Sequence, residues 1–122
     1  MTTPYGSEEP RFDVCALAMA AGATHVERWT TAQPVQCKKA MERALTHRGF
    51  SLVEIVSQCP THFGRYALNT GDPNAVLDWI KDYTYTDAQA QKRQPEELVG
   101  KLRCGQYICV EKPVYEGTTN LM

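Results

Sequence analysis

Apolar residues recur along the chain at helical spacing in three separate stretches. Residues 12–21 are alanine-rich and apolar on nearly every side, which predicts a mostly buried helix that ends at Gly22. Residues 34–48 predict a second helix with one charged face, and Asp72 followed by Pro73 predicts the start of a third. The expected apolar stripes of the three helices are, in order, Phe12, Cys15 and Met19; Cys37, Met41, Ala44 and Leu45; and Val76, Trp79, Ile80 and Tyr83.

Three shorter stretches have the composition of strands. Residues 24–29 and 102–110 predict two of them, and residues 50–56 are so continuously apolar that they predict a strand covered on both faces, as in a parallel sheet. Helices and strands therefore alternate along the chain. This alternation predicts an α/β fold, a partial three-layer sandwich with a mostly parallel sheet.

The length of 122 residues favours a single domain. Residues 1–10 are rich in proline and small polar residues and predict an exposed arm. Residues 84–95 are polar and are expected to form a linker, and residues 96–98 a short turn. Residues 111–122 are expected to form an irregular tail.

Composition excludes several classes of protein. Thirteen Lys and Arg balance fourteen Asp and Glu, so nothing indicates a nucleic-acid or anionic-membrane surface. The longest apolar run, residues 14–21, is far shorter than the roughly 20 residues that span a bilayer, and it lacks the basic leader of a signal peptide. Five cysteines without a pairing pattern fit reduced thiols. We therefore expect a cytoplasmic protein.

The stretch SLVEIVSQCPTHFGR, residues 51–65, contains the leading candidate for chemistry. Ligands of α/β sheets bind beyond the carboxyl ends of the strands, and Cys59 lies at such an end. A thiolate there is suited to ligate a metal or to act as a nucleophile, whereas the plainer interpretation is a small buried hydrophobe. Cys59 and His62 have the spacing of half a zinc site, but no second half follows in the sequence.

The other cysteines are better explained as core residues. Cys15 and Cys37 fall on the expected buried faces of two helices. Cys104 and Cys109 lie five residues apart on one expected strand, which points them to opposite faces of the sheet.

The remaining polar candidates form no recognisable active site. His25 is expected on a strand surface and His47 at a helix end. Glu54 interrupts an apolar strand, so it requires either a partner, for which Arg65 is one candidate, or an exposed sheet edge. The sequence contains no Ser-His-Asp order, no phosphate-binding loop and no dinucleotide glycine fingerprint.

Several segments resemble one enzyme family. TTPYG (2–6), FDVCALAMAAGATHVER (12–28), GFSLVEIVSQCPTHFGR (49–65), GDPNAVLDWIKD (71–82) and LVGKLRCGQYICVEKPVYE (98–116) occur in this order. Together they resemble the C-terminal part of the β subunit of 2-oxoacid:ferredoxin oxidoreductases, most of all the 2-oxoglutarate type. The resemblance covers nearly the whole chain, and its more specific parts are Thr-Pro-Tyr-Gly and Cys-Pro-Thr.

The resemblance implies cofactors and partners. Such a β subunit binds thiamine diphosphate and Mg²⁺ with an α subunit, and the enzyme converts a 2-oxoacid and CoA to an acyl-CoA and CO₂. Electrons pass through a [4Fe-4S] cluster to ferredoxin. Cys59 matches the Cys-Pro-Thr cysteine that supplies the fourth cluster ligand, a role suited to a thiolate. Thr2 and Thr3 match the end of a loop near the thiamine diphosphate.

The departures from the family pattern are as informative as the matches. The Gly-Asp-Gly motif and the N-terminal Cys-x-x-Cys pair are absent. We therefore expect the chain to be the C-terminal portion of a thiamine diphosphate-binding domain that depends on the α subunit and the N-terminal part of the β subunit. Alone it is expected neither to be active nor to bind these cofactors tightly. A non-catalytic interaction module, or a thiol enzyme with His62 as base for Cys59, stays open as an alternative.

Overall fold

The computed structural model describes residues 9–114. Helices and strands alternate through the first half, as the sequence predicts, and several short helical segments follow in the second half. In chain order the elements are α1 (Val14–Ala20), β1 (His25–Thr30), α2 (Pro34–Thr46), β2 (Ser51–Val56), the π-helix η1 (Pro60–Gly64), α3 (Arg65–Ala67), α4 (Pro73–Tyr83), β3 (Thr84–Thr86), α5 (Asp87–Ala90), α6 (Pro95–Leu98) and β4 (Leu102–Cys109).

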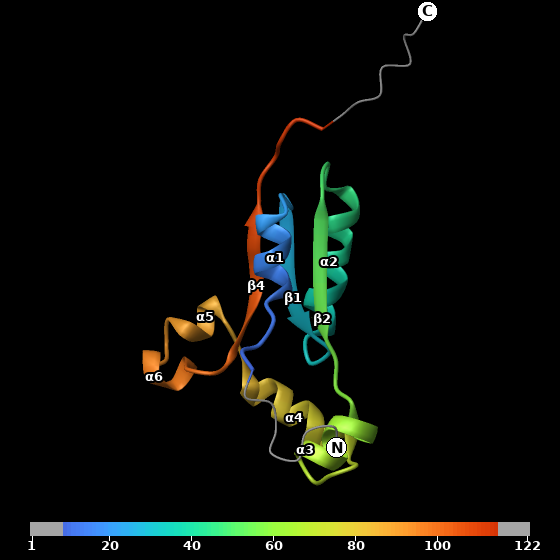
Figure 1. The fold of residues 1–122 in the computed structure, drawn as a ribbon, viewed down its shortest axis with the longest axis vertical. Helices are drawn as coiled ribbons and strands as arrows, with labels where there is room; N and C mark the ends of the chain where they lie inside the picture. The colour runs from blue at the N-terminus through green and yellow to red at the C-terminus, as the bar shows by residue number, and fades with distance from the viewer. Residues whose placement is uncertain (1–8, 115–122) are drawn as a thin grey trace, which may run out of the picture.

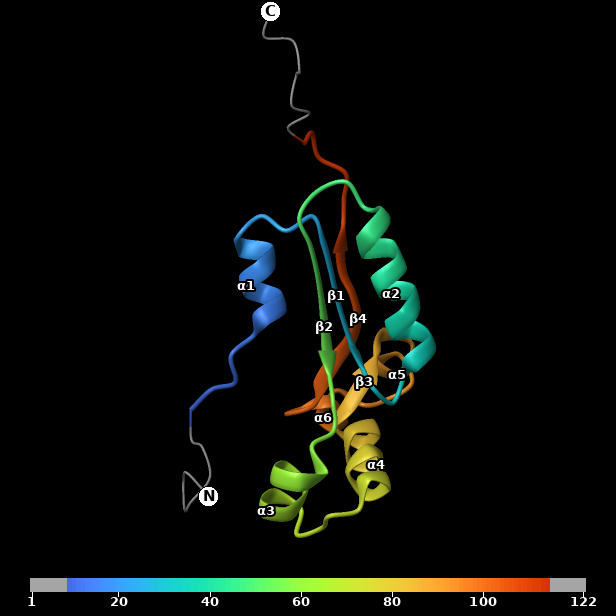
Figure 2. The same ribbon diagram turned by 90° about the vertical axis from the view of Figure 1, so that its right-hand side faces the viewer.

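The four strands form one sheet in the order β2-β1-β4-β3. The β1/β2 and β3/β4 pairs are parallel, whereas β1 and β4 pair antiparallel, as the opposed arrows in Figure 1 show. Figure 2 shows the sheet between α1 on one face and α2 on the other. The predicted α/β class and its layered arrangement are confirmed, and the antiparallel β1/β4 pair makes the sheet mixed.

The helix ends follow from local sequence. The Asp13 side chain accepts a hydrogen bond from the backbone N–H of Ala16 at 3.2 Å and thereby caps α1. The predicted cap of α4 is confirmed, since Asp72 accepts from the N–H of Asn74 at 3.0 Å. Gly22 has a φ of 94°, the left-handed conformation predicted for the residue that follows α1.

The prediction that residues 50–56 form a strand covered on both faces is confirmed in part: α1 and α2 both contact β2, which pairs parallel with β1, but β2 is only half-buried. The apolar strand β2 is a half-buried edge strand of the sheet formed by the described residues, and β1 is the buried strand inside it. Burial of the more polar β1 is possible because its charges are paired. Arg28 lies 2.6 Å from Glu54 and 2.8 Å from Asp13, so the partner of Glu54 is Arg28 and not Arg65.

The segment predicted as a linker also contains regular structure. Residues 84–95 hold β3 and α5, where Thr86 donates its backbone N–H to the side chain of Gln89 at 2.8 Å. An ion pair between Asp87 and Arg103, at 2.7 Å, ties this segment to β4. The sequence pattern misses these elements because they are short and polar and depend on the contact with β4. The described part of the tail, residues 111–114, has no helix or strand, as expected.

The main apolar cluster lies between α1 and the sheet. Its buried members are Cys15, Ala18, Ala23 and Val26. The predicted apolar stripes are buried only in part: Phe12 is 71% exposed and Leu45 87% exposed. Figure 2 shows each of α1 and α2 with the sheet on one side and no element of residues 9–114 drawn over its other side. No helix in this part of the chain is long and apolar enough to cross a membrane.

Candidate functional site

Cys59 lies beyond the carboxyl end of β2 and is the residue that immediately precedes η1. The π-helix begins with Pro60 and closes tightly, since the N–H of Gly64 donates to the carbonyl of Cys59 at 2.8 Å. A Cβ on Gly64 would lie 2.7 Å from the carbonyl oxygen of Thr70 and 2.8 Å from a methyl group of Val76. The turn that presents Cys59 therefore requires a glycine at position 64.

The Cys59 thiol is exposed, so its interpretation as a small buried hydrophobe is wrong. Hydrogen bonds from the backbone N–H groups of Phe63 and His62 lower the pKa of the Cys59 thiol, and the Thr61 hydroxyl acts in the same direction. These donors stabilise the charged form of the sulfur. The loop therefore presents an accessible thiol in surroundings that favour its thiolate form.

An apolar cavity of about 210 Å³ lies beside Cys59. Aromatic rings form much of its wall: the Phe63 and Trp79 centroids are 4.8 Å apart, and Trp79 stacks on Tyr83 at 4.6 Å. An apolar wall next to a sulfur limits the access of water. In metal centres, such control of solvent access tunes the redox potential. The cavity lining comprises Val56, Ser57, Gln58, Cys59, Phe63, Val76, Trp79, Ile80 and Tyr83.

His62 does not act with the Cys59 sulfur through its ring. The ring packs against Tyr66 with centroids 5.0 Å apart, and the contact of His62 with the thiol runs through its backbone N–H. Among residues 9–114, neither Cys59 nor His62 belongs to a group of three side chains placed to hold a metal. Thr2 and Thr3 lie outside the described residues.

The structure brings together a second group, which the sequence reasoning missed. His25, His47 and Cys109 lie close together at the opposite end of β1 from Cys59. His25 is 1% exposed, so its prediction as a strand-surface residue is wrong. The core prediction is also wrong for Cys109, which is exposed, and it is confirmed for the other three cysteines. These three buried cysteines are Cys15, Cys37 and Cys104.

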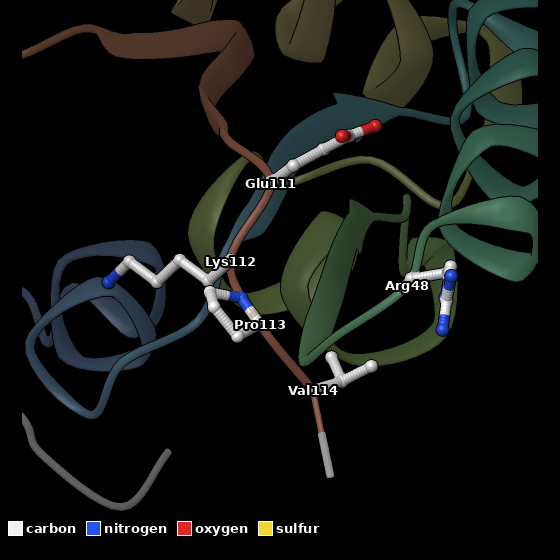
Figure 3. A pocket seen from close by; sticks show the side chains of 5 residues that line it. All are labelled: Arg48, Glu111, Lys112, Pro113 and Val114. Carbon is white, nitrogen blue, oxygen red and sulfur yellow. The ribbon is translucent and has the colours of Figure 1, made fainter. Parts of the chain in front are cut away.

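Near the same end of the sheet, Arg48 and the start of the tail border an open cavity of about 510 Å³. Its lining comprises Arg48, Glu111, Lys112, Pro113 and Val114. Figure 3 shows that the side chains of Glu111 and Lys112 point in different directions rather than toward a common point. Without converging polar groups, this cavity is a weaker candidate site than the Cys59 loop.

Comparisons with known proteins identify relatives of the chain. Residues 1–55 match the family described as thiamine pyrophosphate enzyme, C-terminal TPP binding domain. The 2-oxoglutarate synthase subunit KorB of Methanocaldococcus jannaschii is 40% identical over 114 residues, which are 93% of this chain and 42% of that protein. KorB of Methanothermobacter marburgensis is 41% identical over 112 residues, 92% of this chain and 39% of that protein.

A solved structure agrees with these relatives. It is the 2-oxoglutarate:ferredoxin oxidoreductase from Magnetococcus marinus with 2-oxoglutarate, coenzyme A and succinyl-CoA bound, which matches with a TM-score of 0.65 and 27% identity. The match covers 93% of this chain and 38% of that one, so the chain spans about two-fifths of the length of its relatives. The resemblance inferred from the sequence is thereby confirmed: over most of its length the chain is similar to part of the KorB subunit of 2-oxoglutarate synthase and to part of a 2-oxoglutarate:ferredoxin oxidoreductase.

Proposed function

We propose that this chain acts within a 2-oxoacid:ferredoxin oxidoreductase, where Cys59 is one of the thiolate ligands of a [4Fe-4S] cluster. The proposed enzyme oxidatively decarboxylates a 2-oxoacid, 2-oxoglutarate, to an acyl-CoA and CO₂, and electrons leave through the cluster to ferredoxin. The likeness to KorB and to the Magnetococcus enzyme supports this activity and this substrate class.

The environment of Cys59 is the observation that carries the proposal. Cluster ligands are thiolates, and hydrogen bonds to their sulfurs tune the potential of the cluster. The backbone N–H groups of Phe63 and His62 supply such bonds, and the cavity beside the thiol supplies an apolar wall. The thiol is also exposed, so a cluster held by other polypeptide has access to it.

The remaining cofactor groups come from outside the described residues. A single thiol does not hold a four-iron cluster, since such clusters take four cysteine ligands. We infer that the other ligands, and the groups that bind thiamine diphosphate and Mg²⁺, come from the α subunit and the N-terminal part of a β subunit. Thr2 and Thr3 are proposed to lie near the thiamine diphosphate. The assembled enzyme is expected to work in the cytoplasm.

Substitution of Cys59 in the assembled complex tests this function. With the partner chains supplied, Cys59→Ser should reduce 2-oxoglutarate- and CoA-dependent reduction of ferredoxin to background and should lower the iron content of the complex. Cys37→Ser is the matched control: the Cys37 thiol donates to the carbonyl of Thr30 at 3.2 Å, and a serine hydroxyl can donate the same bond. The control should retain both activity and iron.

The alternatives predict different results. If the chain is a non-catalytic module, Cys59→Ser will leave activity and iron unchanged, and the proposal fails. If Cys59 is instead the nucleophile of a thiol enzyme with His62 as base, His62→Gln will abolish activity while the iron content stays the same. The packing of the His62 ring against Tyr66 argues against that second outcome.

A further inference from the structure

We propose that His25, His47 and Cys109 form a binding site for a divalent transition-metal ion of the zinc class. The site lies at the opposite end of β1 from Cys59 and does not rest on the function proposed above. One ring nitrogen of each histidine and the sulfur of Cys109 all lie within 4.8 Å of one another. Two imidazoles and a thiolate form a donor set that zinc and its chemical relatives prefer.

The fold brings these residues together from distant parts of the sequence. His25 begins β1, and Cys109 ends β4 as its partner in the antiparallel ladder. His47 follows the last residue of α2, and its ring lies beside that of His25 with centroids 5.3 Å apart. The β1/β4 pair and α2 thus set the positions of the three donors.

The state of His25 is the second observation that points to a ligand. Its side chain is 1% exposed, yet Nδ1 of its ring has no hydrogen-bond partner among the described residues. The other nitrogen, Nε2, lies 3.0 Å from a carboxylate oxygen of Glu27. A buried polar group without a partner costs free energy, and a bound metal ion would remove that cost.

Neighbouring groups are placed to orient both imidazoles. Metal-binding histidines commonly donate their second ring nitrogen to a carboxylate or another polar group. Glu27 stands beside Nε2 of His25, and the hydroxyl of Thr24 lies 2.8 Å from Nε2 of His47, which leaves Nδ1 of each ring available for an ion. A side chain at Gly49 would lie 2.5 Å from that hydroxyl, so a glycine keeps this contact free.

The geometry requires only a small closure. Ordinary zinc bond lengths place tetrahedral nitrogen and sulfur donors about 3.3–3.6 Å apart, so the present spacing must shorten by at most about 1.5 Å. His25 is held within the fold, whereas His47 is half-buried and Cys109 is exposed, so rotation of these two side chains can provide the movement. Their exposure also leaves a coordination position open to water or to a further donor.

Cobalt titration of the full chain tests the proposal, because Co²⁺ occupies zinc sites and a Co²⁺–thiolate bond gives a charge-transfer band in the near ultraviolet. The reduced chain should bind one Co²⁺ with this band, and Zn²⁺ should displace it. Cys109→Ser should abolish the band. His47→Gln should weaken Co²⁺ binding by about 100-fold, because the loss of a ligand should cost at least as much as the loss of a residue that only orients a ligand.

Controls separate this site from adventitious binding to other thiols. Cys37→Ser and Cys59→Ser should both retain the band, and far-ultraviolet circular dichroism should show that every variant is folded. The substitutions target the two residues with the more exposed side chains, so that the buried His25 is left intact. The proposal is overturned if no band forms, if Cys109→Ser retains it, if Cys59→Ser abolishes it, or if His47→Gln leaves the affinity unchanged.

Discussion

The two ends of the parallel β1/β2 pair carry candidate sites of different construction. At the carboxyl end of the neighbouring strand β2, Cys59 is an exposed sulfur whose hydrogen-bond donors come from the next few residues of its own loop. At the opposite end, His25, His47 and Cys109 come from β1, the end of α2 and β4. The first site is local, and the second exists only when the antiparallel pair has formed.

This difference implies different sensitivities to substitution. The Cys59 loop is held by tight backbone contacts around Gly64, whereas the histidine end contains a buried charge network. Glu27 is fully buried there and accepts hydrogen bonds from Arg43 at 2.7 Å and from the indole of Trp29 at 2.7 Å. Although burial acts to raise the pKa of Glu27, these bonds lower it below its ordinary value, so the carboxylate is charged at neutral pH.

Removal of Arg43 should have the largest effect on stability. Arg43→Met leaves Glu27 buried with a charge that Arg43 no longer compensates, a change that typically costs about 3–5 kcal/mol. The free energy of unfolding from urea denaturation of the full chain measures this loss. Lys38→Met is the matched control on the same helix, because Lys38 pairs with Glu42 at the surface, at 3.7 Å, and such pairs contribute about 0–1 kcal/mol. Equal losses of unfolding free energy in the two variants would show that Arg43 does not compensate the buried charge of Glu27.

Gly64→Ala should cause the next largest loss of stability, at the end of the sheet that carries Cys59. The added methyl group meets the carbonyl of Thr70 and a methyl of Val76 at less than 3 Å, and overpacking of this kind typically costs about 1–3 kcal/mol. The same change at Gly71 is the control, since the nearest atom to a Cβ there is 3.6 Å away, on the side chain of Arg65. An unfolding free energy equal to that of the Gly71→Ala variant would show that the turn can relax.

The two ends also differ in how far the sequence predicts them. Two features of the sequence point to Cys59, its position after an apolar strand and the family resemblance, and both are contained in a few consecutive residues. No local motif marks the second site. His47 follows His25 by 22 residues, and Cys109 follows His47 by 62 residues. Their proximity depends on the β1/β4 pair, and a pattern of alternating helices and strands favours parallel pairs instead.

Burial was predicted less well than the elements themselves. The helices α1, α2 and α4 and the strands β1, β2 and β4 lie within a few residues of their predicted bounds. The apolar composition of residues 50–56 predicts a strand covered on both faces, yet β2 is only half-buried. The more polar β1 is the buried strand, because Arg28 and Glu27 have charged partners there. Charge pairing is a tertiary property, and composition alone does not show it.

The smallest expected effect concerns the protonation of Cys59 and leaves stability unchanged. Backbone N–H donors lower the pKa of the Cys59 thiol, so the rate of its alkylation should reach half its maximum at a pH below the value near 8.5 of a free cysteine. Peptide mass spectrometry separates this reaction from that of Cys109, the other exposed thiol among the described residues. In concentrated urea the loop donors are lost, and the midpoint for Cys59 should rise to that of a free cysteine. If the folded and unfolded midpoints coincide, the loop does not favour the thiolate, and the local construction of this end of the sheet contributes nothing to the chemistry of its sulfur.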